Sequence, residues 1–230
     1  MKPRTDATRK PRDRIIATAR DLFRKHGIRG VGVDAIAEAA STNKMTLYRH
    51  FGSRDDLVVA CLKDVGGEAE KIWQGFERDY PDDPLAQLRA WVRCGAECVS
   101  GDGRGCDMAN AAIELAATNH PARDFIVEFK TAQRDRLARL CRQAGVEKAE
   151  LLADALSLLV EGARVNRQSV GAGGPCARFI AIAESVIAAS RGQTKGRVRS
   201  EIYAPAVQTG KASPHAIPTD FPELDISYSG

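Results

Sequence analysis

The chain has no long hydrophobic run: no segment of its 230 residues approaches the roughly 20 apolar residues needed to cross a bilayer. No charged stretch followed by an apolar one opens the sequence as a secretory signal would. These two absences predict no membrane partner and a cytoplasmic protein. With 43% apolar residues, the chain can still build a substantial core.

The sequence also lacks the clustered side chains of common active sites. Its histidines, at 26, 50, 120 and 215, form neither an HExxH pattern nor a Ser-His-Asp arrangement. The GDGRG stretch at 101–105 lacks the Gly spacing and the Lys-Ser/Thr of a phosphate-binding loop, and it follows a predicted helix. We therefore expect no enzyme activity and no cofactor.

Six cysteines, at 61, 94, 98, 106, 141 and 176, occur without a secretory signal, which favours reduced thiols over disulfides. Cys94 and Cys98 share a helix face and Cys106 follows shortly. With no nearby histidine or second cysteine pair, they match a zinc site poorly, so we expect no metal. Two interpretations stay open: small buried hydrophobic residues, or thiols that sense an electrophile or an oxidant.

What the sequence does contain is a pair of short predicted helices around a turn, within residues 33–56. The second begins after Asn43, whose side chain can accept an unpaired backbone N–H, and runs to His50 with only Leu47 and Phe51 as core residues. At about 1.5 Å per residue this helix is about 12 Å long, close to the ~12 Å width of the DNA major groove. Its length and polarity suit a helix that reads base edges.

The charge distribution supports the same interpretation. Residues 1–56 hold 13 Lys and Arg against 7 Asp and Glu, a net of +6, whereas the rest of the chain holds 21 against 23. A helix is predicted over 11–26, with Gly27 as its C-terminal cap. The basic residues 1–10 before it form an arm that either follows the DNA backbone or is simply a solvated terminus. Ser53 with Asp56 predicts the start of a further helix.

The run from Arg14 to Leu57, with IIATARDLFRKHGIRGVGV, DAIAEAA and TLYRHFGSRDDL, resembles the DNA-binding domain of TetR/AcrR-family transcriptional regulators. The resemblance implies an all-α homodimer: a three-helix N-terminal DNA-binding head with a helix-turn-helix, and a C-terminal helical body for ligand binding and dimerisation. It implies a double-stranded DNA operator, a small-molecule inducer and no catalysis. The chain departs from the family's usual pattern at Ser41, Thr42 and Met45.

Site residues follow from the resemblance position by position. It assigns phosphate contacts to Tyr48, His50 and Arg54. It assigns base contacts to Lys44, Met45, Thr46 and Arg49. We add two arginines at the start of the first predicted helix as DNA contacts, Arg12 and Arg14.

The chain divides into four predicted parts: a basic flexible arm at 1–10, a helix-turn-helix domain at 11–56, an effector-binding and dimerisation domain at 57–191, and a tail at 192–230. The tail is rich in proline and scattered charge and has no sustained period, so we expect it to be disordered.

The last two predicted helices carry apolar bands with small residues, which either complete the core of one chain or form a four-helix interface between two copies. The resemblance favours the interface. Its candidate residues are Ala155, Leu158, Leu159, Gly162, Ile180, Ala183 and Ile187.

A ligand pocket is expected among the middle helices, because apolar walls with a few polar anchors suit small molecules. Its candidate residues are Trp73, Trp91, Cys94, Cys98, Met108, Asn110, Glu114, Phe125, Phe129, Arg164 and Asn166. A buried carboxylate at Glu114 would favour a cationic or hydrogen-bonding effector.

The sequence thus predicts a sequence-specific DNA-binding transcriptional regulator, a ligand-responsive repressor that acts as a homodimer on a palindromic operator. The alternative is a helical small-molecule-binding or scaffold protein that no longer binds DNA, which the three departures at Ser41, Thr42 and Met45 would support.

Overall fold

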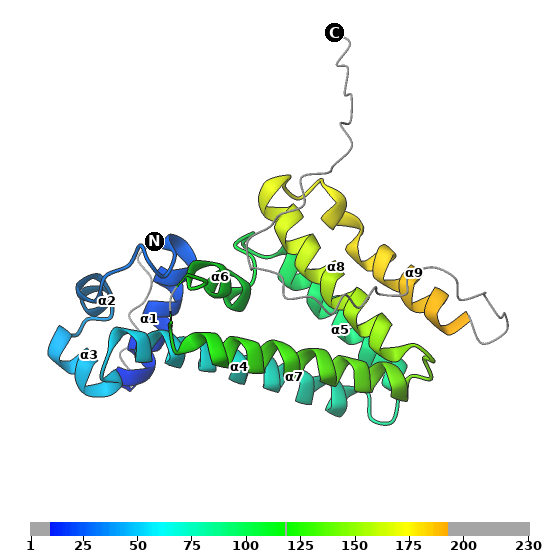
Figure 1. The fold of residues 1–230 in the computed structure, drawn as a ribbon, viewed down its shortest axis with the longest axis horizontal. Helices are drawn as coiled ribbons and strands as arrows, with labels where there is room; N and C mark the ends of the chain where they lie inside the picture. Colours follow the sequence, from blue (N-terminus) through cyan, green and yellow to red (C-terminus); the bar gives the residue numbers. More distant parts are fainter. Residues whose placement is uncertain (1–9, 118, 193–230) are drawn as a thin grey trace, which may run out of the picture. The chain divides into compact units, whose positions relative to one another are not determined.

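The computed structural model describes residues 10–117 and 119–192, and the regular structure of this part is entirely helical, as predicted (Figure 1). Its helices are α1 (Pro11–His26), α2 (Val33–Ala39), α3 (Lys44–Phe51), α4 (Arg54–Asp79), α5 (Pro84–Ser100), α6 (Asp107–Glu114), α7 (Ala122–Gln143), α8 (Ala149–Ser169), the 3-10 helix η1 (Pro175–Arg178) and α9 (Phe179–Gly192). None of these helices is long and apolar enough to span a membrane. Most of the predicted arm and nearly all of the predicted tail lie outside the described residues.

Local signals in the sequence set where the first helices begin and end. Proline at the first position of α1 loses no hydrogen bond there, and Gly27, at φ 76°, ends the helix as predicted. The Asn43 side chain accepts from the Thr46 amide at 2.8 Å and caps α3. Ser53 accepts from the Asp56 amide at 3.0 Å and caps α4. Both predicted caps are confirmed.

The head, which we define as α1, α2 and α3, encloses a core of its own. Leu47 of α3 and Ile15 of α1 are fully buried in it, and α2 contributes Ile36. Leu57 and Cys61 from the first turns of α4 complete this core. The head therefore has no complete core without the start of the next helix.

The α4 helix continues without interruption through the predicted domain boundary at residue 56. Leu57 and Cys61 face the head, whereas Val58 and Leu62, one position further along, enter a second cluster with α6 and α7. Near its other end, Trp73 joins the core of the body. The α4 helix thus contributes residues to three apolar clusters, from adjacent stripes on its surface.

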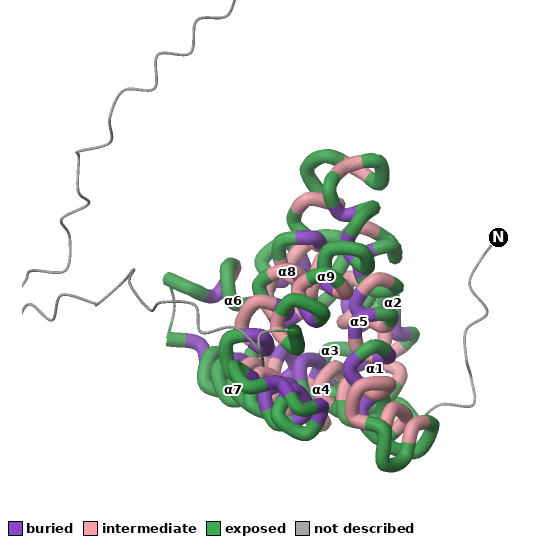
Figure 2. The backbone as a smooth tube through the Cα atoms, turned by 90° about the vertical axis from the view of Figure 1, so that its right-hand side faces the viewer, coloured by how far each residue is buried: buried purple, intermediate pink, exposed green. Residues whose placement is uncertain are grey.

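The body consists of α5, α7, α8 and α9 packed against one another and against the second half of α4. Its centre contains Leu88, Leu137, Leu152 and Leu156, each at most 1% exposed. Figure 2 shows buried and exposed positions alternating along these helices, as expected for amphipathic helices around a shared core.

This second cluster, shared by α4, α6 and α7, joins the head to the body. Ile28, from the loop between α1 and α2, packs with Val58 and Leu62 of α4 and with Met108 and Ala111 of α6. Because α6 is only eight residues long, its position depends on this cluster more than on its own helical stability.

The two sides of α3 provide a matched test of the fold. We expect Leu47→Ala to lower the free energy of unfolding by about 2–5 kcal/mol, because it opens a cavity in the head core. Met45→Ala, two residues away, removes a side chain that is 82% exposed and should change this quantity by less than about 0.5 kcal/mol. Denaturant unfolding measures both. Equal effects would contradict the orientation of α3.

Candidate nucleic-acid interface and effector cavity

One face of α3 is exposed along its whole length. Lys44, Met45 and Arg49 are exposed, and Tyr48 is 37% exposed beside them. The Lys44 ammonium lies 3.3 Å from the Asp34 carboxylate of α2, a solvated ion pair that contributes little to stability. The helix therefore presents a row of polar, cationic and aromatic side chains to solvent.

The other predicted DNA contacts are less free. Thr46 and His50 are half-buried. Arg12 is exposed, and its guanidinium lies 5.3 Å from the centre of the Phe51 ring, where the cation is held over the aromatic face. This contact places one positive charge next to the end of α3.

Arg14 contacts the end of α2. Its Nε donates to the carbonyl oxygen of Ala40 at 2.8 Å, and a terminal nitrogen donates to Ser41 at 3.5 Å. The last carbonyls of a helix have no partner within the helix, so the guanidinium acts as a C-terminal cap. We predicted that Arg14 contacts DNA. In the structure its guanidinium donates hydrogen bonds that stabilise the turn before α3.

Arg54 has a similar role on the other side of the head. It donates to the carbonyl oxygens of Ile28 and, at 3.2 Å, Val31. It is half-buried by these contacts and ties the first turn of α4 to the loop between α1 and α2. The predicted phosphate contact at Arg54 thus competes with two backbone acceptors that already engage the guanidinium.

The turn between α2 and α3 explains one departure from the family pattern. Ser41 has a φ of 49°, in the left-handed region that glycine adopts without strain. The Thr42 amide donates to Ala37 at 2.9 Å, and the Ser41 amide donates to Glu38 at 3.0 Å, so the turn closes normally despite both substitutions.

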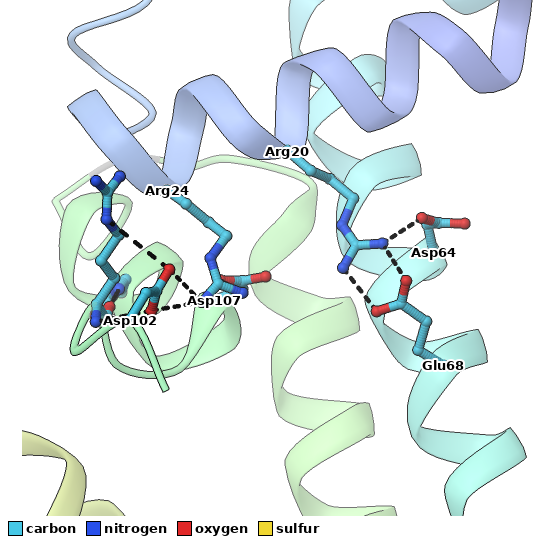
Figure 3. A network of polar contacts seen from close by, with 8 residues as sticks. Arg20, Arg24, Asp64, Glu68, Asp102 and Asp107 are labelled. Carbon is cyan, nitrogen blue, oxygen red and sulfur yellow. Dashed lines mark hydrogen bonds and ion pairs between the residues drawn. The ribbon is translucent and has the colours of Figure 1, made fainter. Parts of the chain in front are cut away.

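A network of ion pairs joins α1 to the rest of the chain (Figure 3). Arg20 points toward α4, where it pairs with Asp64 and forms hydrogen bonds of 2.6 and 2.7 Å with both oxygens of Glu68. The hydrogen bonds with Glu68 raise the pKa of Arg20 and lower the pKa of Glu68. Because the Arg20 side chain is only 17% exposed, this pairing is better shielded from salt than a surface ion pair.

Arg24, one turn further along α1, reaches the segment before α6. It lies 3.0 Å from a carboxylate oxygen of Asp102 and 3.5 Å from one of Asp107 (Figure 3). Burial raises the pKa of Asp107, against the opposing effect of the Arg24 charge. The start of α6 is thus held electrostatically to the head.

The end of α6 also contacts the head. A carboxylate oxygen of Glu114 accepts from the Arg29 amide at 3.1 Å. A side chain at Gly27 would come within 3.0 Å of that carboxylate, so both the φ of Gly27 and the space around it require glycine. Glu114 and Asn110 line a small cavity beside Arg20 and Arg24, apart from the other predicted pocket residues. We predicted an effector contact at Glu114, and its carboxylate instead binds the head's backbone.

The main cavity lies in the body, between α4, α5, α7 and α8, and has a volume of about 430 Å³. Seven candidates from the sequence line it: Trp73, Trp91, Cys94, Cys98, Met108, Phe129 and Arg164. Two candidates lie elsewhere: Phe125 packs in the cluster between head and body, and Asn166 borders a groove between α8 and α9.

Several polar residues of the cavity were not predicted from the sequence. Lys130, Gln133 and Arg134 of α7 and Glu161 of α8 line its wall. Gln133 accepts a hydrogen bond of 2.6 Å from the Trp73 indole. The sequence does show polar residues along α7, but the solvent-exposed faces of amphipathic helices carry the same residue types. The polar residues of α7 that line the cavity therefore cannot be told apart from surface residues by sequence alone. Within the described residues no group of three or more His, Cys, Asp or Glu could hold a metal ion.

The α8 and α9 helices have one buried side and one exposed side. Ala183 and Ile187, predicted at a dimer interface, are 0% and 2% exposed in the core of the chain itself, so they are not available to a second subunit. Leu158 and Ile180 are exposed, as is Gly162, and Ala155 and Leu159 are half-buried. One side of this helix pair therefore completes the core of the chain, and the other side is exposed.

The head matches a known family of DNA-binding domains. Residues 15–61 match the model of the bacterial regulatory proteins of the tetR family. A crystal structure of a TetR-family transcriptional regulator from Streptomyces coelicolor is similar over 79% of this chain and 96% of that one, with a TM-score of 0.70 and 25% identity. Residues 15–61 of this chain thus carry a TetR-family DNA-binding domain, and the chain has the fold of a TetR-family regulator.

Curated relatives of this chain are also regulators. The transcriptional regulator AcuR of Cereibacter sphaeroides is 27% identical over 158 residues, which are 65% of this chain and 72% of AcuR. The regulator RutR of Escherichia coli K12 is 30% identical over 87 residues, 36% of this chain and 38% of RutR. By these likenesses the chain is a DNA-binding transcriptional regulator and not an enzyme. Two of the three departures from the family pattern, Ser41 and Thr42, leave the turn intact.

Arg54 offers a test that distinguishes a structural role from a DNA-contacting role. We expect Arg54→Ala to lower the free energy of unfolding by about 1.5–3 kcal/mol, because two carbonyl oxygens lose a charged donor. Arg49→Ala, an exposed arginine on α3, should leave it within about 0.5 kcal/mol. If Arg54→Ala leaves stability unchanged and instead weakens the salt dependence of DNA binding, the arginine acts on phosphate.

Proposed function

We propose that this regulator is a ligand-responsive repressor that binds a palindromic operator as a homodimer. The observation that carries the proposal is the exposed face of α3, held outward by Leu47 on a head with an excess of positive charge. Two such helices, one from each subunit, would enter successive major grooves. Operator binding in front of a promoter, followed by loss of transcription in a purified system, tests repression directly.

The DNA contacts fall into two groups on this proposal. Base edges are read by the exposed residues of α3 and by the half-buried residue next to them: Lys44, Met45, Arg49 and Thr46. Phosphates are bound around the ends of α3 by Arg12, Tyr48 and His50. Arg14 and Arg54 support these contacts by holding the turn and the loop in position, as their hydrogen bonds to backbone carbonyls indicate.

The two groups respond differently to substitution. We expect Arg12→Ala to weaken binding to all sequences alike and to flatten the slope of log affinity against log salt by about one unit, because one phosphate contact is lost. Arg49→Ala should cost about 1–3 kcal/mol on the operator and relax base preference at one position. Fluorescence anisotropy with DNA flanking the native gene, at several salt concentrations, measures both effects.

A matched control uses a charge far from the head. Arg78, at the other end of α4, is exposed and pairs only with its neighbour Asp79 among the contacts we describe. Arg78→Ala changes the net charge by the same amount and should leave the salt slope and the base preference unchanged. If it flattens the slope as much as Arg12→Ala does, overall charge explains binding and the assigned contacts do not.

The exposed side of α8 supports a homodimer. Leu151, Leu158 and Val165 are 63%, 74% and 60% exposed at intervals of seven residues, so they form one stripe along the helix. Leu158 of this stripe and Ile182 of α9, which is 39% exposed, both line a groove between the two helices, so the exposed apolar surface continues from α8 onto α9. A contiguous apolar face of this kind favours burial against a second copy.

The exposed stripe of α8 allows the proposed dimer to be disrupted by a single substitution. We expect Leu158→Arg to yield a monomer by light scattering and to weaken operator affinity by about 100-fold or more, because the two heads then bind independently. Val127→Arg, on the exposed side of α7, is the matched control: that side chain is 65% exposed and lies off the stripe. A dimer that survives Leu158→Arg would place the interface elsewhere.

The effector site on this proposal is the body cavity. Its apolar walls with Arg164, Lys130 and Gln133 suit a small molecule with a polar or anionic end. Met108 of α6 lines the cavity and belongs to the cluster that joins head and body. A ligand that moves α6 would favour a head spacing that no longer fits the operator, and affinity would fall by the difference in binding free energy between the two states.

A further inference from the structure

Met45 has no packing role in the head. Its side chain is 82% exposed, the largest value among the large apolar side chains that the structure describes. Leu47 and Phe51, at 0% and 7%, hold α3 to the head core instead. The turn before α3 accommodates the departures at Ser41 and Thr42, whereas the fold gives no reason for the departure at Met45. The Met45 thioether is therefore free to contact a partner outside the chain.

The other polar side chains in the first turn of α3 are restrained. The Lys44 ammonium lies 3.3 Å from the Asp34 carboxylate of α2. Thr46 is half-buried, and its amide donates to the Asn43 side chain that caps the helix. Met45 is thus the most accessible side chain of this turn, at the start of the helix that we place in the major groove.

Arg49 lies one turn further along the same face of α3. Residues four positions apart on a helix are neighbours, with about 5–6 Å between their Cβ atoms. The Arg49 side chain is exposed and makes no ion pair or hydrogen bond with the part of the chain that the structure describes. Successive base pairs of DNA are about 3.4 Å apart. We therefore expect Met45 and Arg49 to reach base pairs that are about two steps apart or closer.

We propose that Met45 recognises the 5-methyl group of a thymine in the major groove, within about two base pairs of a guanine that Arg49 binds. Thymine presents this methyl group on its major-groove edge, where apolar side chains contact it. A thioether donates no hydrogen bond and is a weak acceptor, so it distinguishes bases by apolar contact. An unpaired guanidinium matches O6 and N7 of guanine. This proposal rests on the proposed function, because it requires α3 to lie in the major groove.

A change from thymine to uracil isolates this contact. It removes the methyl group and keeps every hydrogen-bonding atom of the base, so base pairing and phosphates are unchanged. Burial of one methyl group contributes about fourfold to affinity, so the change should weaken binding about fourfold in one half-site and about 15-fold in both. A methionine that lay against the sugar–phosphate backbone would show no such dependence on the methyl group.

The experiment uses the full chain and duplex DNA of random sequence. Repeated rounds of binding and amplification yield the preferred operator. Each thymine of one half-site is then replaced by uracil, one position at a time, and fluorescence anisotropy measures the dissociation constant of each duplex. We expect a loss of about fourfold at one thymine position in the half-site, the position that Met45 contacts.

Variants of α3 assign the effect to individual side chains. Met45→Ala removes the contact and should bind the thymine and uracil duplexes equally. Met45→Leu keeps an apolar side chain of similar size and should retain most of the difference. Thr46→Ser, the matched control, removes the neighbouring methyl group of α3 and should leave the difference at about fourfold. Selection repeated with Arg49→Ala should relax the guanine preference within about two base pairs of that thymine.

The outcomes separate methyl recognition from operator binding itself. Methyl recognition by Met45 is overturned if the wild-type chain tolerates uracil at every position, or if the uracil effect persists in Met45→Ala or disappears in Thr46→Ser. Operator binding stands in all three cases. A guanine preference that relaxes far from the thymine would overturn the pairing with Arg49. If selection enriches no sequence at all, the proposed function fails, and methyl recognition fails with it.

Discussion

The packing of α1 against the first turns of α4 is the contact on which both halves of the molecule depend. Leu57 and Cys61 of α4 close the head core, and Val58 and Leu62, on the adjacent stripe, belong to the cluster shared with α6 and α7. Arg20 fixes the same two helices through Asp64 and Glu68. Since the two stripes lie side by side on one helix, a rotation of α4 relative to α1 would disturb both clusters at once.

In this arrangement the short helix α6 connects the cavity to the head directly, and the proposed coupling between ligand and DNA binding can act through it. The short helix α6 is tied to the head at both ends, by Arg24 with Asp107 and by the Glu114 carboxylate with the Arg29 amide. Its Met108 side chain lines the cavity. A helix of eight residues has little stability of its own, so it takes its position from these contacts and moves when they change.

The arginines of the head show how similar residues serve different purposes. Arg14 and Arg54 resemble DNA contacts in the sequence, because each lies near the helix-turn-helix and carries a charge. Their guanidinium groups instead donate to backbone carbonyls 23 to 27 residues away, which orders the turn and the loop around α3. Unpaired carbonyls at helix and loop ends need such donors, and a buried unsatisfied carbonyl costs more than an exposed charge gains in water.

The amino-acid sequence by itself determined the helices and their ends, because apolar periodicity and caps such as Asn43 and Ser53 act within a few residues. It also identified the exposed face of α3 and seven of the residues that line the cavity. Only the tertiary structure decided which side of an amphipathic helix meets which neighbour. Ala183 and Ile187 therefore lie in the chain's own core, and Glu114 binds an amide 85 residues away. Periodicity defines an apolar face, but the partner of that face depends on how distant helices pack.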